Sequence, residues 1–138
     1  MDPDRSRRLD ADLQALCDAL LPKLPHAPHA MHYAHHGEWW LALEMLSDWC
    51  VDSHPLVSLS AAELMRFVAI GESMGLRRPW ADLLPLVQGQ EAESLPLEYA
   101  VMAREYLHKE VRANPIREAW LLRVEAAVFR IGAAHRTP

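Results

Sequence analysis

Two residue pairs, each spaced four positions apart, are candidates for catalytic chemistry. Glu44 and Asp48 are spaced to share one face of a helix, and paired carboxylates serve as acid and base in glycoside hydrolases. We expect them on an open helix face, where nothing raises the pKa of either one. Cys50 and His54 resemble a thiol and its base, but Pro55 ends the helix there and Cys50 points toward the predicted core. The sequence therefore predicts no catalytic residues.

Histidines recur every three residues between His26 and His35, and His36 follows directly. Imidazoles on one side of a helix can bind zinc, and His29, His32 and His36 are the candidates for such a site. The intervening prolines interrupt the helix, and a three-residue step drifts around it, so the rings do not all converge on one ion. A surface helix with incidental histidines is the preferred interpretation and no cofactor is expected, but a metal-binding helical protein stays open as an alternative.

Apolar periodicity predicts an all-α protein. Leu9, Leu13, Leu16 and Leu20 fall on one helical face, and the other helices are predicted in the same way. No stretch alternates like a strand, and no internal repeat is present, so we expect an irregular bundle of about six helices. The predicted helices, one of them very short, span residues 8–21, 28–36, 38–52, 60–74, 79–84, 95–113 and 115–132.

Capping residues predict where several of these helices begin and end. Gly37 and Gly75 can take the left-handed conformation that closes a preceding helix, and His36 is placed to cap the carbonyls beside Gly37. Ser60 and Glu63 have the spacing of a capping box. Ser94 is expected to cap the helix over 95–113, and Asn114-Pro115 to separate it from the last one.

The predicted helix over 38–52 has an apolar side and a mixed side. Trp40 lies outside the apolar stripe, beside Ser47, and the acids Glu44, Asp48 and Asp52 follow one another along the neighbouring ridge. A tryptophan next to an acidic row is typical of a recognition surface. The alternative is that the row is an ordinary solvated face and that Trp40 packs under the C-terminal helices. The stripe consists of Trp39, Ala42, Leu43, Leu46, Trp49 and Cys50, within about 120° of the helix circumference.

Length and composition suit one helical domain. The chain has 138 residues, of which 51% are hydrophobic and 24% charged, enough to bury a single core. Its charged N-terminus resembles neither a signal peptide nor a membrane span, so we expect a cytoplasmic protein. Cys17 and Cys50 lie among apolar neighbours and are expected to be buried thiols rather than a disulfide.

The net charge of −5 is concentrated in one segment. Between Gly37 and Met65 the chain has five acidic residues and no Lys or Arg. Nucleic acid binding is therefore not expected, because a phosphate backbone requires a basic stripe. The acids of this segment are Glu38, Glu44, Asp48, Asp52 and Glu63.

Three features in this part of the chain occur together in a known family. The pattern G-E-x-x-x-A-L-x-x-L begins at Gly37, an S-x-x-E helix start follows at Ser60, and a Met-Gly-Leu turn ends the next helix at Met74. In this order and with this spacing, the stretch from His32 to Leu86 resembles the core of the MafI family of bacterial immunity proteins. The resemblance does not extend to the Pro- and His-rich approach over 21–36 or to about forty C-terminal residues.

The resemblance implies a small helical protein that is not an enzyme and that neutralises a cognate secreted toxin domain by occluding its active site or substrate cleft. An acidic face would suit a toxin with a basic surface, such as a nuclease. A helical adaptor that docks a cellular protein, or self-associates through Trp40, remains the alternative from another class. The residues expected to bind the partner are Trp40, Glu44, Ser47, Asp48 and Asp52.

The C-terminal helical pair, expected over 94–132, has two open interpretations. Its last helix presents an apolar face with charges around it, so the pair can complete the core. A segment added to a shared scaffold can instead carry the specificity for one toxin. The apolar face consists of Ile116, Trp120, Val124, Ala127 and Ile131.

Overall fold

Helices make up the regular secondary structure in the part of the chain that the structure describes. A computed structural model describes residues 2–109 and 115–136, with backbone alone at 115–117. The prediction of an all-α fold is confirmed there, and the single β-bridge, between Leu59 and Val87, is isolated. The elements are α1 (Pro3–Leu20), the 3-10 helix η1 (Ala27–Ala30), α2 (Met31–His35), α3 (Trp39–Asp52), α4 (Ala61–Ser73), the 3-10 helix η2 (Ala81–Leu86), α5 (Gly89–Ala92), α6 (Leu97–Lys109) and α7 (Pro115–Arg136).

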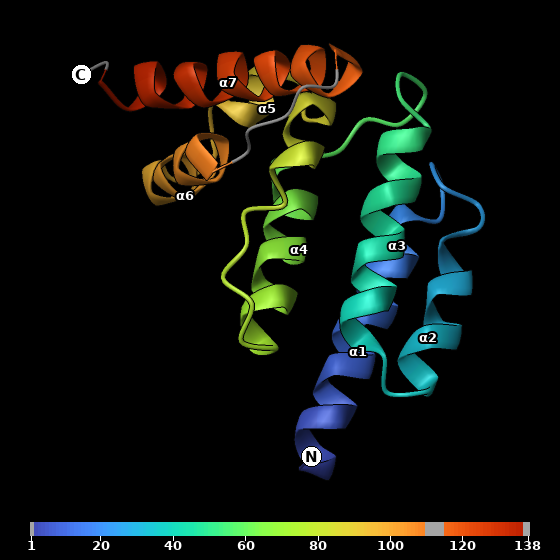
Figure 1. Ribbon diagram of the computed structural model, residues 1–138. Helices are drawn as coiled ribbons and strands as arrows, with labels where there is room; N and C mark the ends of the chain where they lie inside the picture. Colours follow the sequence, from blue (N-terminus) through green and yellow to red (C-terminus); the bar gives the residue numbers. More distant parts are fainter. Residues whose placement is uncertain (1, 110–114, 137–138) are drawn as a thin grey trace.

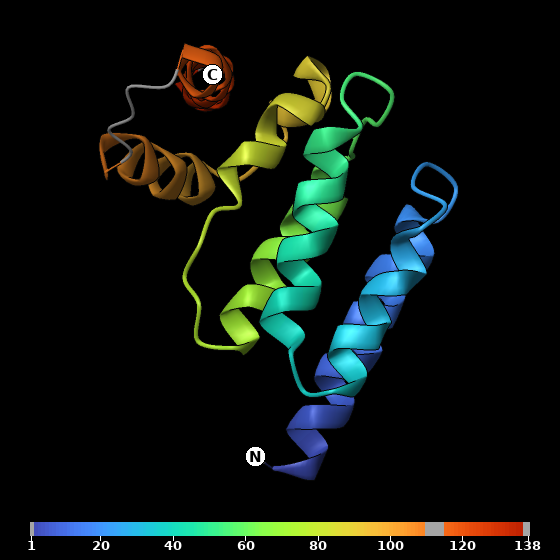
Figure 2. The ribbon, with the colours of Figure 1, turned by 45° about the vertical axis from the view of Figure 1, so that its right-hand side comes forward.

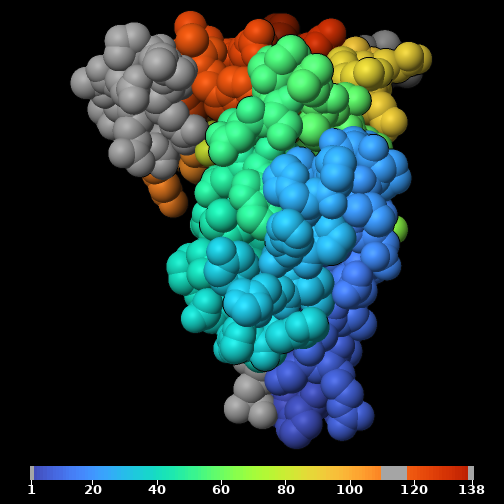
Figure 3. All heavy atoms as spheres, turned by 90° about the vertical axis from the view of Figure 1, so that its right-hand side faces the viewer, coloured from blue at the N-terminus to red at the C-terminus, as the bar shows by residue number. Residues whose placement is uncertain are grey.

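The helices form two groups that meet at η2. Helices α1 to α4 run side by side along the length of the molecule, whereas α6 and α7 lie across one end of them (Figures 1 and 2). Helix α7 packs on α6, α5 and η2, and η2 packs on α3. Viewed from the side of α2, the molecule tapers from the α7 end to the first turns of α1 (Figure 3).

Helix α1 begins earlier than its leucines predict. Asp2 caps it by accepting a hydrogen bond from the Asp4 backbone N–H at 3.1 Å, and Pro3 takes the first helical position, where no N–H is needed. The charged first turn therefore belongs to the helix although it contributes no side chain to the core. The predicted apolar face is confirmed, with Leu9, Leu13, Leu16 and Leu20 all buried.

The predicted start of α4 is confirmed in detail. Ser60 Oγ accepts from the Glu63 backbone N–H at 3.0 Å, and Glu63 Oε1 accepts from the Ser60 backbone N–H at 2.8 Å. Two N–H groups that the first helical turn leaves unpaired are thus satisfied by one reciprocal pair. Leu64, Phe67 and Val68 on the next turns are buried.

The C-terminal helices differ from their predicted boundaries. Ser94 does not cap the next helix, because its hydroxyl donates to the Glu91 carbonyl at 2.6 Å and α6 begins only at Leu97. The short helix α5 before it was not predicted. The predicted end at Ala113 and the Asn114 boundary lie outside the described residues, while α7 begins at Pro115 and continues past the predicted end at Gly132.

The inner face of α7 completes the core. Val124, Ala127 and Ile131 are buried as predicted. Trp120 is half-buried, and its indole N–H donates to the Asp82 carbonyl of η2 at 3.0 Å. The side chain of Ile116, the remaining member of the predicted face, lies outside the description.

Trp80 is the largest buried side chain at the junction of the two groups. It has a left-handed backbone, with φ of 51°, and only 1% of its surface is exposed. Its ring lies 5.9 Å from that of Phe67, and the Arg78 guanidinium carbon lies 4.1 Å from the ring centroid. Such a backbone costs about 1 to 3 kcal/mol in a non-glycine residue, which the burial of a large indole offsets.

Within residues 2–109 and 115–136, no helix is both long and apolar enough to cross a bilayer.

Candidate functional site

The two adjacent tryptophans of α3 have different environments. Trp39 is half-buried, and its indole N–H donates to Asp10 Oδ1 of α1 at 2.7 Å. Trp40 keeps 55% of its surface exposed, so it does not pack under the C-terminal helices. The neighbours therefore divide their roles as the helical periodicity predicts, with Trp39 joining α3 to α1 and Trp40 facing solvent. A large exposed aromatic is the kind of side chain that anchors protein interfaces.

The predicted core stripe of α3 is largely confirmed. Four of its members are fully buried, and the two tryptophans are half-buried, with Trp49 in edge contact with the His26 ring at a centroid distance of 4.9 Å. Ser47, predicted to share the partner-binding surface with Trp40, is buried, with 5% of its surface exposed. Its small side chain lies at the margin of the stripe, so the buried face of α3 is wider than the sequence pattern indicates. Ser47 is therefore removed from the candidate interface.

Two helix ends approach the surface around Trp40. At the end of α2, Gly37 has φ of 76°, its N–H donates to Ala34 O, and the next N–H, of Glu38, donates to Tyr33 O, both at 2.9 Å. This is a Schellman motif, which satisfies carbonyls at a helix end. It turns the chain sharply into α3, so that Trp40 follows within one helical turn.

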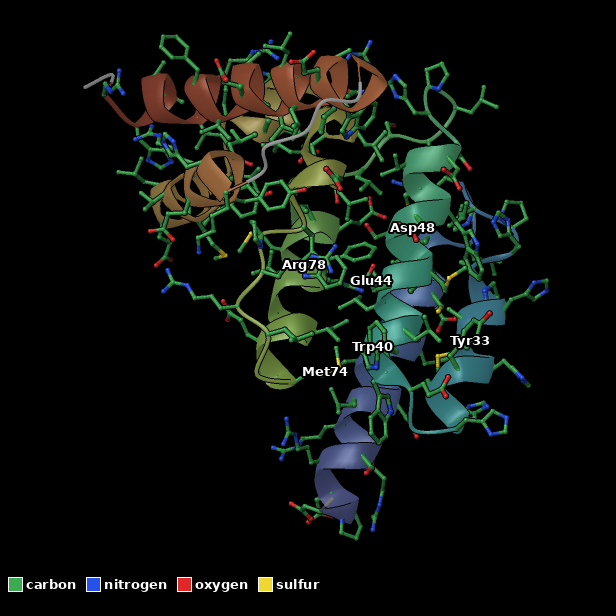
Figure 4. The ribbon with its side chains drawn as sticks, in the orientation of Figure 1. Tyr33, Trp40, Glu44, Asp48, Met74 and Arg78 are labelled. Atoms are coloured by element: carbon green, nitrogen blue, oxygen red, sulfur yellow. The ribbon has the colours of Figure 1, made fainter. Side chains whose placement is uncertain are left out.

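The end of α4 repeats this geometry. Gly75 has φ of 80°, its N–H donates to Glu72 O, and the Leu76 N–H donates to Gly71 O, both at 2.9 Å. Both predicted glycine stops are thus confirmed. The second motif places Met74 and Leu76 opposite Trp40, and Figure 4 shows Trp40 and Met74 on the same side of the molecule.

A groove of about 510 Å³ lies between these two helix ends. Trp39, Trp40, Met74 and Leu76 give it apolar walls. Such a volume accommodates a few side chains of a partner or a small ligand. We call this feature the Trp40 groove.

The charges that line the Trp40 groove are mainly positive. Arg5, Arg77 and Arg78 line it together with a single acid, Glu44. Arg5 is held in place by donating to the Ser73 carbonyl at 2.7 Å. The expectation of an acidic surface around Trp40 was therefore wrong. Helix α3 has no Lys or Arg of its own, but arginines from distant parts of the sequence pack beside it.

Glu44 forms an ion pair with Arg78, which Figure 4 shows reaching toward it from the segment after α4. The carboxylate is partly covered, with 28% of its side chain exposed. Arg78 also lies over the Trp80 ring, and this contact orients the guanidinium toward α3. Of the three acids predicted to face a partner, Glu44 is thus already paired within the chain.

Asp48 and Asp52 remain exposed along the ridge of α3. Partial burial raises the pKa of Asp48, and the nearby Glu44 and Asp52 carboxylates raise it further. The expectation that nothing on this face raises a carboxyl pKa was therefore wrong. The causes are partial desolvation first and then the like charges on the neighbouring turns, and Asp48 lies on a ridge of α3 rather than in a catalytic cleft.

The histidines do not form a three-ligand metal site in the described structure. The rings of His32 and His36 are in edge contact, with centroids 4.9 Å apart, one helical turn apart in sequence. Among residues 2–109 and 115–136, no group of three or more His, Cys, Asp or Glu side chains is arranged to hold a metal ion, so His29 does not complete a site with this pair.

Cys50 and His54 do not form a dyad. Both cysteines are buried free thiols, as predicted, and burial raises the pKa of Cys17 to about 11 and that of Cys50 to about 12. Such thiols stay protonated at neutral pH and are poor nucleophiles. His54 instead packs on α7, with its ring 5.2 Å from that of Trp120 and Nε2 2.7 Å from Arg123 Nη1.

Comparisons with known proteins neither support nor refute the resemblance to the MafI family. No family model matches the chain, and neither the search of curated proteins nor that of solved structures finds a similar one.

Sequence reasoning missed most of the groove. Arg5, Leu76, Arg77 and Arg78 come from segments remote from α3. The run Gly75-Leu76-Arg77-Arg78 offers one usable signal, because a helix stop followed by two arginines must leave the arginines near the end of that helix.

Proposed function

We propose that this protein is a cytoplasmic, non-enzymatic immunity protein that binds a cognate toxin domain through the Trp40 groove and the adjoining ridge of α3. The observation that carries the proposal is the exposed indole of Trp40 on the wall of an apolar groove of about 510 Å³. An exposed tryptophan beside a concave apolar surface supports a protein-binding role more than any other class. The MafI-like motifs support the choice of an immunity protein within that class.

The charges around the groove would fix the orientation of the bound toxin. Arginines gather at the groove, with Arg77 exposed, whereas Asp48 and Asp52 are exposed one to three turns further along α3. We infer that the toxin places an apolar side chain with an acidic neighbour in the groove and a basic residue against the ridge. Opposite charges at the two ends exclude the reversed orientation, since reversal would oppose like charges.

The chemistry of the described residues supports inhibition by binding rather than by reaction. The cysteines are buried as protonated thiols, and the raised pKa of Asp48 arises on the exposed ridge of α3. Glu44, one helical turn before Asp48, is paired with Arg78. A rigid face of this kind neutralises a toxin by covering its active site or its substrate cleft.

The test begins with the neighbouring reading frame. The proposal requires a secreted protein encoded there, whose C-terminal domain arrests cell growth when expressed alone. Co-expression of the present chain should restore growth, and the two should co-purify. A toxic domain whose effect persists, with no complex formed, would refute the proposal.

The groove is tested with a matched pair of variants. Trp40→Ala should weaken binding of that toxin domain at least tenfold and abolish rescue, as expected of an interface hot spot. Leu97→Ala, which removes an exposed apolar side chain from α6, should leave both unchanged. Equal affinity of the two variants would separate the function from the groove.

A further inference from the structure

Helix α7 has two apolar sides, and only one of them contributes to the core. Trp120, Val124 and Ile131 face η2 and α6. On the other side Leu122 and Phe129 are exposed, with 64% and 66% of their surfaces open. Large apolar side chains arranged on an open helix face indicate an interaction surface rather than scattered exposure.

The outward apolar residues follow a seam pattern. Ala119, Leu122, Ala126 and Phe129 are all exposed and are separated by three, four and three residues. This alternation keeps side chains on one line of a helix and is the spacing of the contact positions of a coiled coil. The seam covers roughly 15 Å of helix, and α7 continues beyond it in both directions. We call these four residues the α7 seam.

Charges border the α7 seam with opposite signs on its two sides. Glu118 and Glu125 lie on one side, and Arg123 and Arg130 on the other, all exposed. If a second α7 packs along the seam in parallel, each glutamate faces the arginine five positions later on its partner. These pairs are Glu118 with Arg123 and Glu125 with Arg130. An antiparallel pair would instead oppose like charges, so the pattern fits a parallel copy of this chain.

The surroundings leave room for such a partner. Helix α7 forms one end of the molecule, with α5 and α6 on its inner side, and in neither ribbon view does a described element lie beyond it (Figures 1 and 2). Two contacts position the flanking arginines. Arg123 meets His54 at 2.7 Å, and the Arg130 guanidinium lies against Gly89.

We propose that the protein forms a parallel homodimer in which the α7 seams of two copies pack together. The helix is already folded in each copy, so a short seam suffices for a weak dimer of the size class of transient interfaces. The twofold axis runs parallel to α7, and none of the residues that line the Trp40 groove lies in α7. This inference is independent of the proposed immunity function.

Sedimentation equilibrium over a rising series of protein concentrations tests the dimer. The unaltered chain should shift from monomer to dimer mass, and a variant with both Leu122→Glu and Phe129→Glu should stay monomeric at every concentration. The control replaces two exposed apolar residues of α6, Leu97→Glu and Val101→Glu, and should dimerise like the unaltered chain. A monomer throughout for the unaltered chain, or loss of dimer in the control alone, would overturn the proposal.

The orientation is tested by charge exchange and by cross-linking. Glu125→Arg should weaken dimerisation, and adding Arg130→Glu to it should restore the dimer, since the pair re-forms with its signs exchanged. Ala126→Cys should form a disulfide between copies, because equivalent seam positions meet in a parallel pair, while Ala62→Cys on exposed α4 should not. No restoration in the exchanged variant, with circular dichroism showing an intact fold, or no disulfide at position 126, would exclude the parallel arrangement.

Discussion

The segment 37–65, which has no Lys or Arg, contributes two carboxylates to ion pairs in different surroundings. They are Glu63 at the start of α4 and Glu44 on α3, and each pairs with a cation from outside the segment. Glu63 is buried, accepts from Lys23 Nζ at 2.7 Å and also closes the capping box. Glu44 is partly exposed and pairs with Arg78 at the edge of the Trp40 groove. Glu63 joins α4 to the segment after α1 from a buried position, whereas Glu44 joins α3 to the segment after α4 at the surface.

The comparison shows why a cluster of like charges in sequence is not yet a charged face. Of the five acids between Gly37 and Met65, Glu44 and Glu63 have their charges met by Arg78 and Lys23. The partners lie 34 and 40 residues away, so no local pattern reveals them. Only the acids that are not paired within the chain are available to bind a partner. Asp48 and Asp52 are the exposed ones on α3.

The largest expected effect is on the Glu63 side. Glu63→Ala should lower the free energy of unfolding by about 2 to 3 kcal/mol, because it leaves the Ser60 N–H without its acceptor and Lys23 without its counter-charge, although Lys23 keeps the Ser58 carbonyl and some solvent. Urea unfolding measures this. Glu72→Ala, an exposed site on the same helix, is the control and should change stability little. An equal loss of unfolding free energy in the two variants would show that the buried acid contributes no more to stability than a surface acid.

Ser60 gives a smaller effect at the same helix start. Ser60→Ala removes only the acceptor for the Glu63 N–H, and loss of such a cap lowers stability by about 1 kcal/mol. Ser60→Asp restores an acceptor at the same place and should recover most of the loss in the same urea measurement. If Ser60→Asp were no more stable than Ser60→Ala, the loss would not come from the cap.

Glu44 should matter less for stability than either. Its pair with Arg78 is part-exposed, so a double-mutant cycle with Glu44→Gln and Arg78→Gln should give a coupling of about 0.5 to 1 kcal/mol. The coupling should shrink in concentrated salt. A value comparable with that of Glu63 and Lys23, measured by the same cycle, would contradict the contrast drawn here.

Asp48 should show the smallest effect, and of opposite sign. Its pKa is raised in the folded state, so folding favours the protonated form, and stability falls as pH rises through the range above 3.8. Asp48→Asn should therefore melt slightly higher than the unaltered chain at neutral pH and equally at a pH below 3.8. Asp12→Asn, on exposed α1, controls for the loss of one negative charge. A lower melting temperature for Asp48→Asn at neutral pH would show that its charge stabilises the fold.

Much of the fold could be predicted because its signals are local. Both glycine stops, the capping box and the buried faces of α1, α3 and α4 depend on residues within a few positions of one another. The misplaced start of α6 has a local cause as well, since Ser94 bonds backward to Glu91 rather than forward.

The site could be predicted only in part, because it depends on distant contacts. The exposure of Trp40 follows from the helical period and is confirmed. The burial of Ser47 and the arrival of Arg5, Arg77 and Arg78 at the groove depend on how α1 and the segment after α4 pack on α3. Trp80, which is buried against Phe67 and lies under the Arg78 guanidinium, has a left-handed backbone that no propensity indicates.

We propose the Trp40 groove as the surface where another protein binds. The measurement that tests it is the calorimetric affinity of the proposed toxin domain for the unaltered chain and for Trp40→Ala, with melting temperatures in parallel. We predict at least tenfold weaker binding with an unchanged melting temperature, because the indole is exposed and supports no core contact. Unchanged affinity in a folded Trp40→Ala protein would contradict the account.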